Sequence, residues 1–323
     1  MSQTPPQFSS KPSANSASKN PIKRHAPWLY AFWKFSRPHT IVGTTCSVLG
    51  IYLIAFSENG QWSIGDRNIV LSILLTLFTC LCGNIYIVGL NQLEDVAIDR
   101  INKPHLPLAS GEFSRQQGVA IVAVTGILAI LLAGFQSSYL LGMVGLSLAI
   151  GTVYSLPPIR LKRFPFWASL CIFGVRGAIV NLGLFLHFNQ GLPIPIQVWI
   201  LTLFIIVFTF AIAIFKDIPD MEGDRQYNIS TFTLRLGQKA VFNLARSVLT
   251  GCYLGMVVFS IWLPDVNAPF LVISHLLALG SLGLRSYKID LQDRSEVARF
   301  YQFIWKLFFL EYLIFPAACL LNF

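Results

Sequence analysis

Long apolar runs, separated by short polar segments, occupy almost all of the chain after residue 27. Nine runs are long enough to form helices that cross a bilayer, since about 20 apolar residues span its hydrocarbon core. They cover residues 40–57, 69–90, 118–135, 139–156, 167–187, 198–215, 241–262, 269–284 and 303–321. Two polar residues, Arg176 and Asn181, interrupt the fifth run. The pattern predicts an all-α, polytopic membrane protein with nine transmembrane helices.

The composition and the charge distribution support this prediction. The chain is 54% hydrophobic and only 12% charged, whereas a soluble domain carries about twice that fraction of charge. With the N-terminus inside, 22 of the 24 Lys and Arg residues fall in the inner segments and the first turns of the helices that follow them. This asymmetry matches the positive-inside rule. The net charge of +9 therefore reflects topology, and nucleic acid is not expected as a partner.

The first 27 residues differ from the rest of the chain. They are rich in Ser, Pro and Lys and lack acidic residues and an apolar core, so they predict a disordered inner tail and not a secretory signal. A truncated organelle transit peptide has a similar composition. The aromatic stretch from Trp28 to Phe35 predicts an interfacial lead-in to a membrane domain that covers residues 28–323. The six cysteines all lie in apolar runs, and their spacing favours neither disulfides nor a metal site.

Two acidic clusters stand at the ends of the second and sixth apolar runs, and they hold seven of the fifteen acidic residues. Charges at a membrane boundary are costly unless a cation neutralises them. The polar positions in each cluster are spaced so that they share one stripe of a helix. The stripes comprise Asn91, Asp95 and Asp99 in the first cluster and Asp217, Asp220 and Asp224 in the second. Oxygen-rich stripes of this kind are typical sites for Mg²⁺ with a phosphorylated ligand.

The sequences around the two clusters form a weak internal repeat with an offset of 125 residues. A parallel arrangement of the repeats would place both clusters at the mouth of a central cavity that opens to the inner face. Two opposed stripes can then clamp a diphosphate through Mg²⁺. The alternative is that the stripes are solvated helix ends that pair with Arg100 and Arg225. Pro219 and Gly223 predict a bend or an end of the helix near the interface.

Several cations and one tyrosine near the clusters are candidates for binding phosphate. They are Lys103, Arg160, Lys216, Arg225 and Tyr154, with Lys162 and Arg163 equally explained as ordinary positive-inside residues. Tyr154 can alternatively be a plain interfacial tyrosine. An arginine inside an apolar helix is a functional candidate by default, so Arg176 binds an anionic substrate group or pairs with a cluster carboxylate.

The two motifs, Asn-x-x-x-Asp-x-x-x-Asp and Asp-x-x-Asp-x-x-x-Asp, resemble those of the UbiA-type intramembrane aromatic prenyltransferase superfamily. Three longer stretches, 91–114, 154–163 and 216–225, are similar to the tocopherol-pathway members of that superfamily. The resemblance covers the nine helices and implies transfer of a phytyl group from phytyl diphosphate to the ring of homogentisate, with Mg²⁺ and loss of CO₂. The generic motifs alone leave chlorophyll synthase and quinone-pathway members open.

The resemblance also assigns roles and a location. It implies that the six stripe residues bind metal, that their five aspartates are catalytic, and that Arg176 holds the homogentisate carboxylate. It implies a multi-pass protein of a cyanobacterial inner or thylakoid membrane, with the plastid envelope as the alternative. An ion-coupled transporter is a competing reading, although transporter sites usually lie at the bilayer midplane. No residue identifies itself as the base for ring deprotonation, with His39 and His187 the tempting choices.

Overall fold

Nine long helical spans form the body of the protein in the computed structural model, which describes residues 25–59, 67–227 and 229–322. The tail prediction for residues 1–27 falls almost wholly outside the described residues. Each span is long and apolar enough to cross a bilayer, and this confirms the predicted helical membrane architecture. The spans are α3 (Pro38–Asn59), α4 (Arg67–Glu94), α7 (Arg115–Gln136), α8 (Ser138–Ser155), α9 with η2 and α10 (Pro165–Phe173, Gly174–Ile179, Val180–Phe188), α11 (Ile196–Phe215), α14 (Gln238–Phe259), α15 (Ala268–Tyr287) and α16 (Arg294–Leu320).

The last span begins nine residues earlier than the apolar pattern predicts. Asp293 caps its first turn by accepting a hydrogen bond from the backbone N–H of Ser295 at 2.7 Å. The first turns of α16 carry charged side chains, among them Glu296 and Arg299, and these hide the helix from a search for apolar runs. Helix capping and tertiary packing thus extend the helix beyond its membrane-crossing part.

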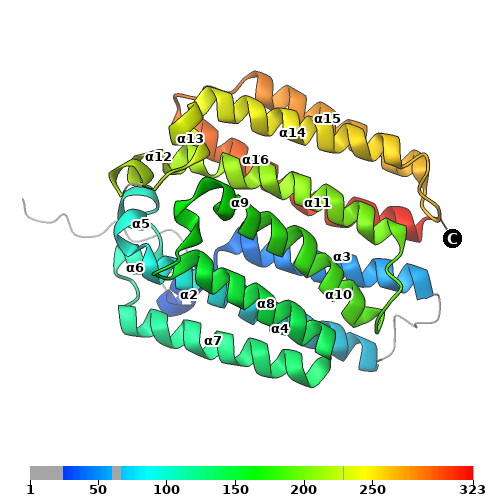
Figure 1. Cartoon of the computed structure of the whole chain (residues 1–323), viewed down its shortest axis with the longest axis horizontal. Helices are drawn as coiled ribbons and strands as arrows, with labels where there is room; N and C mark the ends of the chain where they lie inside the picture. Colours follow the sequence, from blue (N-terminus) through cyan, green and yellow to red (C-terminus); the bar gives the residue numbers. More distant parts are fainter. Residues whose placement is uncertain (1–24, 60–66, 228, 323) are drawn as a thin grey trace, which may run out of the picture.

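In the described part of the chain, five short α-helices and the 3₁₀ turn η1 (Leu161–Arg163) lie outside the nine spans. Figure 1 shows that the five α-helices gather at one end of the bundle, away from the C-terminus. They are α2 (Pro27–Phe35), α5 (Val96–Asn102), α6 (Pro107–Ser110), α12 (Asp217–Gln226) and α13 (Phe232–Leu236). We call this the cluster end, because α5 and α12 follow the two acidic clusters. On α2, Trp28 and Trp33 are about half exposed, as expected of a helix that lies at a membrane interface.

The fifth span changes its helical form around Arg176. Residues Gly174–Ile179 form a π-helical segment, η2, between two α-helical halves. The segment packs closely on α11, because a Cβ added to Gly177 would lie 2.8 Å from the Cα of Ile206. Short π-helical insertions occur often at functional sites, where they change the direction of a side chain.

Candidate active site

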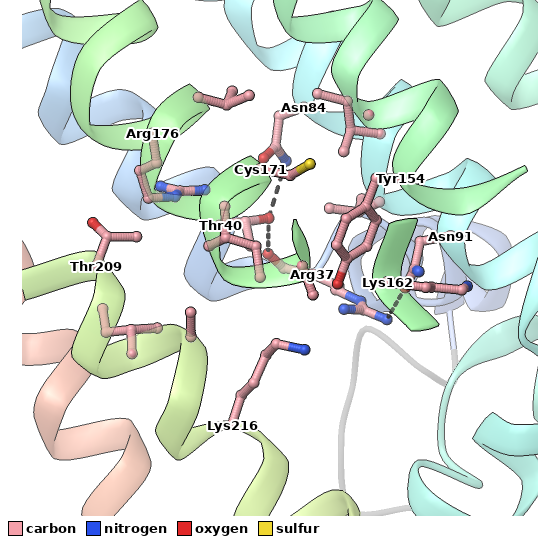
Figure 2. Close-up of a pocket in the computed structure, with 18 of the residues that line it drawn as sticks. Arg37, Thr40, Asn84, Asn91, Tyr154, Lys162, Cys171, Arg176, Thr209 and Lys216 are labelled. Carbon is pink, nitrogen blue, oxygen red and sulfur yellow. Dashed lines mark hydrogen bonds between the residues drawn. The ribbon is translucent and has the colours of Figure 1, made fainter. Parts of the chain in front are cut away.

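A cavity of about 340 Å³ lies inside the bundle and reaches the cluster end. Its walls come from α3, α4, α8, α9, η2 and α11, and Figure 2 shows polar side chains that line it. All six stripe residues predicted from the sequence line this one cavity: Asn91, Asp95, Asp99, Asp217, Asp220 and Asp224. The predicted central cavity, with both clusters at one end of it, is therefore present.

The first cluster keeps a helical pitch through a break in its helix. α4 ends at Glu94 and α5 begins at Val96. Backbone hydrogen bonds from Asp95 to Asn91 (3.1 Å) and from Asp99 to Asp95 (2.7 Å) continue the i to i−4 pattern across the break. The side-chain amide of Asn91 donates to Asp95 Oδ2 at 3.0 Å. The three stripe residues consequently face the same side.

The second cluster lies almost entirely on its own short helix. α11 ends at Phe215, and α12 begins at Asp217. Of the expectation that Pro219 and Gly223 would bend or end the helix, the ending is wrong, because both lie within α12 and the break comes at Lys216. Pro219 sits in the first turn, where a helix leaves backbone N–H groups unpaired in any case.

Direct contacts join the two clusters. Lys103 Nζ lies 2.5 Å from Asp220 Oδ2. Asn102 donates to the backbone carbonyl of Asp220 at 2.9 Å and accepts from the N–H of Gly223 at 2.9 Å. A Cβ at Gly223 would lie 2.6 Å from Asn102 Nδ2, so only glycine leaves room for this contact. The repeat therefore brings the two clusters together at one cavity mouth.

Cations pair with the cluster carboxylates. Asp95 Oδ1 is 2.9 Å from Arg160 Nη2 and 2.6 Å from Lys162 Nζ. Lys216 Nζ lies 3.1 Å from Asp217 Oδ1. Lys162 is buried, and burial lowers the pKa of its ammonium group while the adjacent Asp95 acts in the opposite direction. These partners neutralise part of the charge that the clusters concentrate.

Two aspartates are buried without enough nearby positive charge or hydrogen-bond donors to offset the cost of burying their charged form. Asp99 Oδ2 is buried and has no hydrogen-bond partner among the described residues, and burial raises the pKa of this carboxyl group. Burial, followed by repulsion from Asp220, raises the pKa of Asp224 to about 7. No three His, Cys, Asp or Glu groups converge on one point in the described part of the chain. Mg²⁺ needs only one or two carboxylates beside water and phosphate oxygens, so this all-oxygen donor set fits it.

Arg176 points into the cavity from the π-helical segment, at a distance from the clusters (Figure 2). Its guanidinium carbon lies 5.4 Å from the centroid of Trp305 and 5.7 Å from that of Phe308, within cation–π range. The guanidinium also lies over Gly43, where an added Cβ would be 2.9 Å from Arg176 Nη1. Among the described residues Arg176 forms no ion pair, so the alternative pairing with a cluster carboxylate is not formed.

The remaining candidates divide into those at the cavity and those away from it. Tyr154, Lys103 and Lys216 line the cavity. Arg160 is outside the lining but forms an ion pair with Asp95. Arg225 is exposed on α12 and is not part of the lining. Adjacent residues on a helix differ by about 100° in direction, so Arg225 cannot share the stripe of Asp224.

Sequence reasoning gave no role to Arg37 or Trp305, which line the cavity, and considered His39, which also lines it, only as a possible base. Arg37 donates to Asn91 Oδ1 at 3.3 Å, and the His39 ring packs on Trp305 with centroids 4.9 Å apart. Arg37 precedes the first span, where a cation follows the positive-inside rule and gives no separate signal. His187, the other histidine considered, lies outside the cavity lining and contacts Thr76 Oγ1 at 2.9 Å.

The fold and the site together define an integral, multi-pass membrane protein whose apolar cavity ends in carboxylates and cations, the arrangement required of an intramembrane prenyltransferase. The chain belongs to the UbiA prenyltransferase family, whose family model matches residues 44–307.

Similar proteins cover nearly the whole chain. A homogentisate phytyltransferase of Synechocystis sp. is 53% identical over 90% of this chain and 96% of its own length. Homogentisate phytyltransferase 1 of Arabidopsis thaliana is 40% identical over 89% of this chain and 75% of its own length. The homogentisate solanesyltransferase of the same plant is 36% identical over 91% of this chain and 78% of its own length. Among solved structures, a UbiA homologue from Archaeoglobus fulgidus bound to GPP and Mg²⁺ superposes with a TM-score of 0.62 at 15% identity, over 89% of this chain and 99% of its own. An apo UbiA homologue from Aeropyrum pernix superposes with a TM-score of 0.64 at 18% identity, over 88% of this chain and 98% of its own.

Proposed function

We propose that this protein transfers the phytyl group of phytyl diphosphate to the ring of homogentisate, with loss of the acceptor carboxylate as CO₂, in tocopherol biosynthesis. The observation that carries the proposal is a single apolar cavity with both carboxylate clusters at one end and Arg176 farther in. The names of the relatives from Synechocystis and Arabidopsis point to the same reaction.

The cluster end binds the diphosphate. The six stripe residues hold Mg²⁺, which supplies Lewis-acid stabilisation of the charge that develops on the leaving diphosphate. Lys103, Lys162 and Lys216 stand beside the carboxylates and neutralise phosphate charge that the metal does not meet. Preorganised charges of this kind usually make the largest contribution to catalysis.

The deeper part of the cavity holds the prenyl chain and keeps water out. Apolar side chains of α3 and α8, among them Val48, Val144 and Leu148, form its walls. Exclusion of water protects a developing allylic cation from hydrolysis until the electron-rich acceptor ring attacks it. Arg176 fits the acceptor carboxylate, because its fork of N–H donors is free of protein carboxylates among the described residues.

The purified protein in lipid nanodiscs, supplied with Mg²⁺, tests the reaction directly. We expect phytyl diphosphate and homogentisate to give a product whose mass equals the acceptor plus phytyl minus CO₂, with release of diphosphate. A panel of other aromatic acceptors and an incubation without acceptor serve as controls. Transfer to every acceptor except homogentisate would contradict the assigned acceptor, and release of diphosphate without a coupled product would contradict the transfer.

The role of Arg176 has its own kinetic test. We expect Arg176→Gln to raise the KM for homogentisate by tenfold or more with little change in the KM for phytyl diphosphate, because a bidentate pair with the acceptor is lost. Arg176→Lys keeps the charge but not the forked pair of N–H donors, so its KM for homogentisate should lie between that of the wild type and that of Arg176→Gln. Equal effects on both substrates would instead indicate that Arg176 acts through the structure of the cavity.

The membrane and its orientation follow from the charge pattern and the relatives. The cluster end carries most of the Lys and Arg residues, so we place it on the cytoplasmic side of a cyanobacterial inner or thylakoid membrane. The plastid envelope, with the cluster end in the stroma, is the alternative. In either case both substrates reach the cavity from the cluster end or from the surrounding lipid.

A further inference from the structure

The cavity ends inside the bundle, before the helices reach their far ends. On each of five helices, one residue is the lining residue farthest from the cluster end. These are Val48 on α3, Cys80 on α4, Met143 on α8, Val180 on α10 and Thr209 on α11. On all five helices the lining stops before the helix ends, so the cavity has a floor inside the bundle.

The layer beyond this floor is packed. One turn farther from the cluster end, each wall presents a side chain with no exposed surface: Ile51, Thr76, Leu140, Leu184 and Ile205. Thr76 is also fixed by contacts with Gln136 Oε1 at 2.8 Å and with His187 Nε2 at 2.9 Å. Buried aliphatic side chains and a satisfied polar contact leave no path for a chain to continue straight through the bundle.

Met143 closes the floor because α8 and α10 approach closely at this point. A Cβ added to Gly183 would lie 2.5 Å from the Cβ of Met143 and 2.6 Å from its Cγ. The thioether side chain therefore lies against the backbone of Gly183, and only 6% of its surface is exposed. Methionine is unbranched and fills irregular gaps, so this one side chain can set where the cavity stops.

The depth of the cavity corresponds to a definite length of prenyl chain. Tyr154 at the mouth and Met143 at the floor are eleven residues apart on α8, as are Asn91 and Cys80 on α4. A rise of 1.5 Å per residue makes this depth about 16 Å. An extended isoprenoid unit has four carbon–carbon bonds of about 1.5 Å and spans about 5 Å, so three units reach the floor and a fourth fits with a bend.

We propose that Met143 is the residue that sets the prenyl chain length of the donor, and that it limits the cavity to about four isoprenoid units. This inference rests on the proposed prenyl transfer at the same cavity. A donor of nine units would extend about 45 Å and cannot be accommodated above the floor. The cavity therefore selects a C20 donor by depth, while the clusters bind the diphosphate that all donors share.

The test is a chain-length profile of the protein in nanodiscs, with farnesyl, geranylgeranyl, geranylfarnesyl and solanesyl diphosphates as donors. We expect the wild type to show its highest kcat/KM with the C20 donor and little use of the C45 donor. Met143→Ala deepens the cavity and should raise the C25 to C20 ratio of kcat/KM on the order of tenfold, as expected for several added carbons in an apolar pocket. Met143→Phe should move the preference toward the C15 donor.

Two variants serve as matched controls. Met143→Leu keeps the side chain apolar and similar in volume and should leave the profile unchanged. Met256→Ala truncates another buried methionine, on α14 and outside the cavity lining, and should lower stability without moving the profile. Thermal unfolding of each variant separates loss of fold from a change in selectivity.

Two results would overturn the proposal while leaving prenyl transfer intact. One is equal use of C20 and C45 donors by the wild type, which would mean that the chain leaves the cavity sideways into the bilayer. The other is an unchanged profile in both Met143→Ala and Met143→Phe while each folded variant still transfers the C20 group. Absence of transfer by the wild type with every donor would refute the proposed function, and the floor with it.

Discussion

Asp95 has two roles that a single and a double variant together can separate. It belongs to the proposed metal site, and it is the partner of two cations, Arg160 and Lys162. The side chain of Lys162 is only 6% exposed and that of Asp95 only 12%. Asp95→Asn keeps the size of the side chain but removes its charge, so a buried ammonium group loses its carboxylate.

The expected loss of stability follows from this geometry. Removing one partner of a buried pair costs about 3–5 kcal/mol, and we expect about 3 because Asp99 remains near Lys162 and can take up part of the interaction. For a chain of this size that corresponds to a fall in Tm of about 6–10 °C. Prenyl transfer should fall about 10³-fold, the effect of losing about 4 kcal/mol of electrostatic stabilisation in the transition state.

The double variant Asp95→Asn/Lys162→Met distinguishes the two duties. Methionine replaces the lysine with an apolar side chain of similar length, so the most deeply buried unpaired charge is removed and only the more exposed Arg160 lacks its carboxylate; most of the lost Tm should return. Transfer should stay low, because the carboxylate is still absent. Thermal unfolding and product formation at limiting Mg²⁺ are the two assays. A double variant no more stable than Asp95→Asn, or near-wild-type transfer in either variant, would refute this account of Asp95.

Three further outcomes are expected. Gly43→Ala should raise the KM for homogentisate several-fold and leave the KM for the donor unchanged, because the added Cβ would lie 2.9 Å from Arg176 Nη1. Gly145→Ala is the matched control, because nothing lies within 4 Å of a Cβ added there. Equal effects of the two substitutions would contradict a role of Gly43 in positioning Arg176. Chelation of divalent cations should abolish transfer and added Mg²⁺ should restore it, with unchanged rates in chelator counting against a metal site. Cysteines introduced at Ser110 and Tyr227 should react with a membrane-impermeant thiol reagent from the same, cytoplasmic side, and labelling from opposite sides would contradict the topology.

The sequence predicts the spans and the clusters because both are periodic features of a single helix. The nine apolar runs, of 16 to 22 residues, identify membrane helices from the sequence alone, independently of their packing. The stripe that includes Asp95 and Asp99 depends only on spacing, and the i to i−4 hydrogen bonds keep it even where α4 gives way to α5. Repetition of the motif was sufficient to place both clusters at one cavity mouth, which the contact between Lys103 and Asp220 confirms.

Contacts between distant parts of the chain were beyond the reach of the sequence. Lys162 becomes a buried partner of Asp95 through the short turn Leu161–Arg163, and its sequence context is that of any inner-loop lysine. Trp305 faces Arg176 across 129 residues, and although the apolar run 303–321 predicts the helix that carries it, nothing in the sequence pairs the two side chains. Arg225 illustrates the opposite error, because nearness in sequence to Asp224 suggested a shared role that the direction of its side chain does not support.

The charge of the site explains how so many carboxylates are held at a membrane boundary. Five aspartates line the cavity mouth, and five cations stand among them or pair with them: Arg37, Lys103, Arg160, Lys162 and Lys216. The ligand-free site is therefore close to neutral, which keeps the cost of placing it at the membrane low. A diphosphate accompanied by Mg²⁺ is itself close to neutral, so it can enter without a large change in the total charge. The cluster carboxylates would hold the metal and the cations beside them would bind phosphate oxygens, so loss of a single cation, as in Lys103→Met, should weaken donor binding more than acceptor binding.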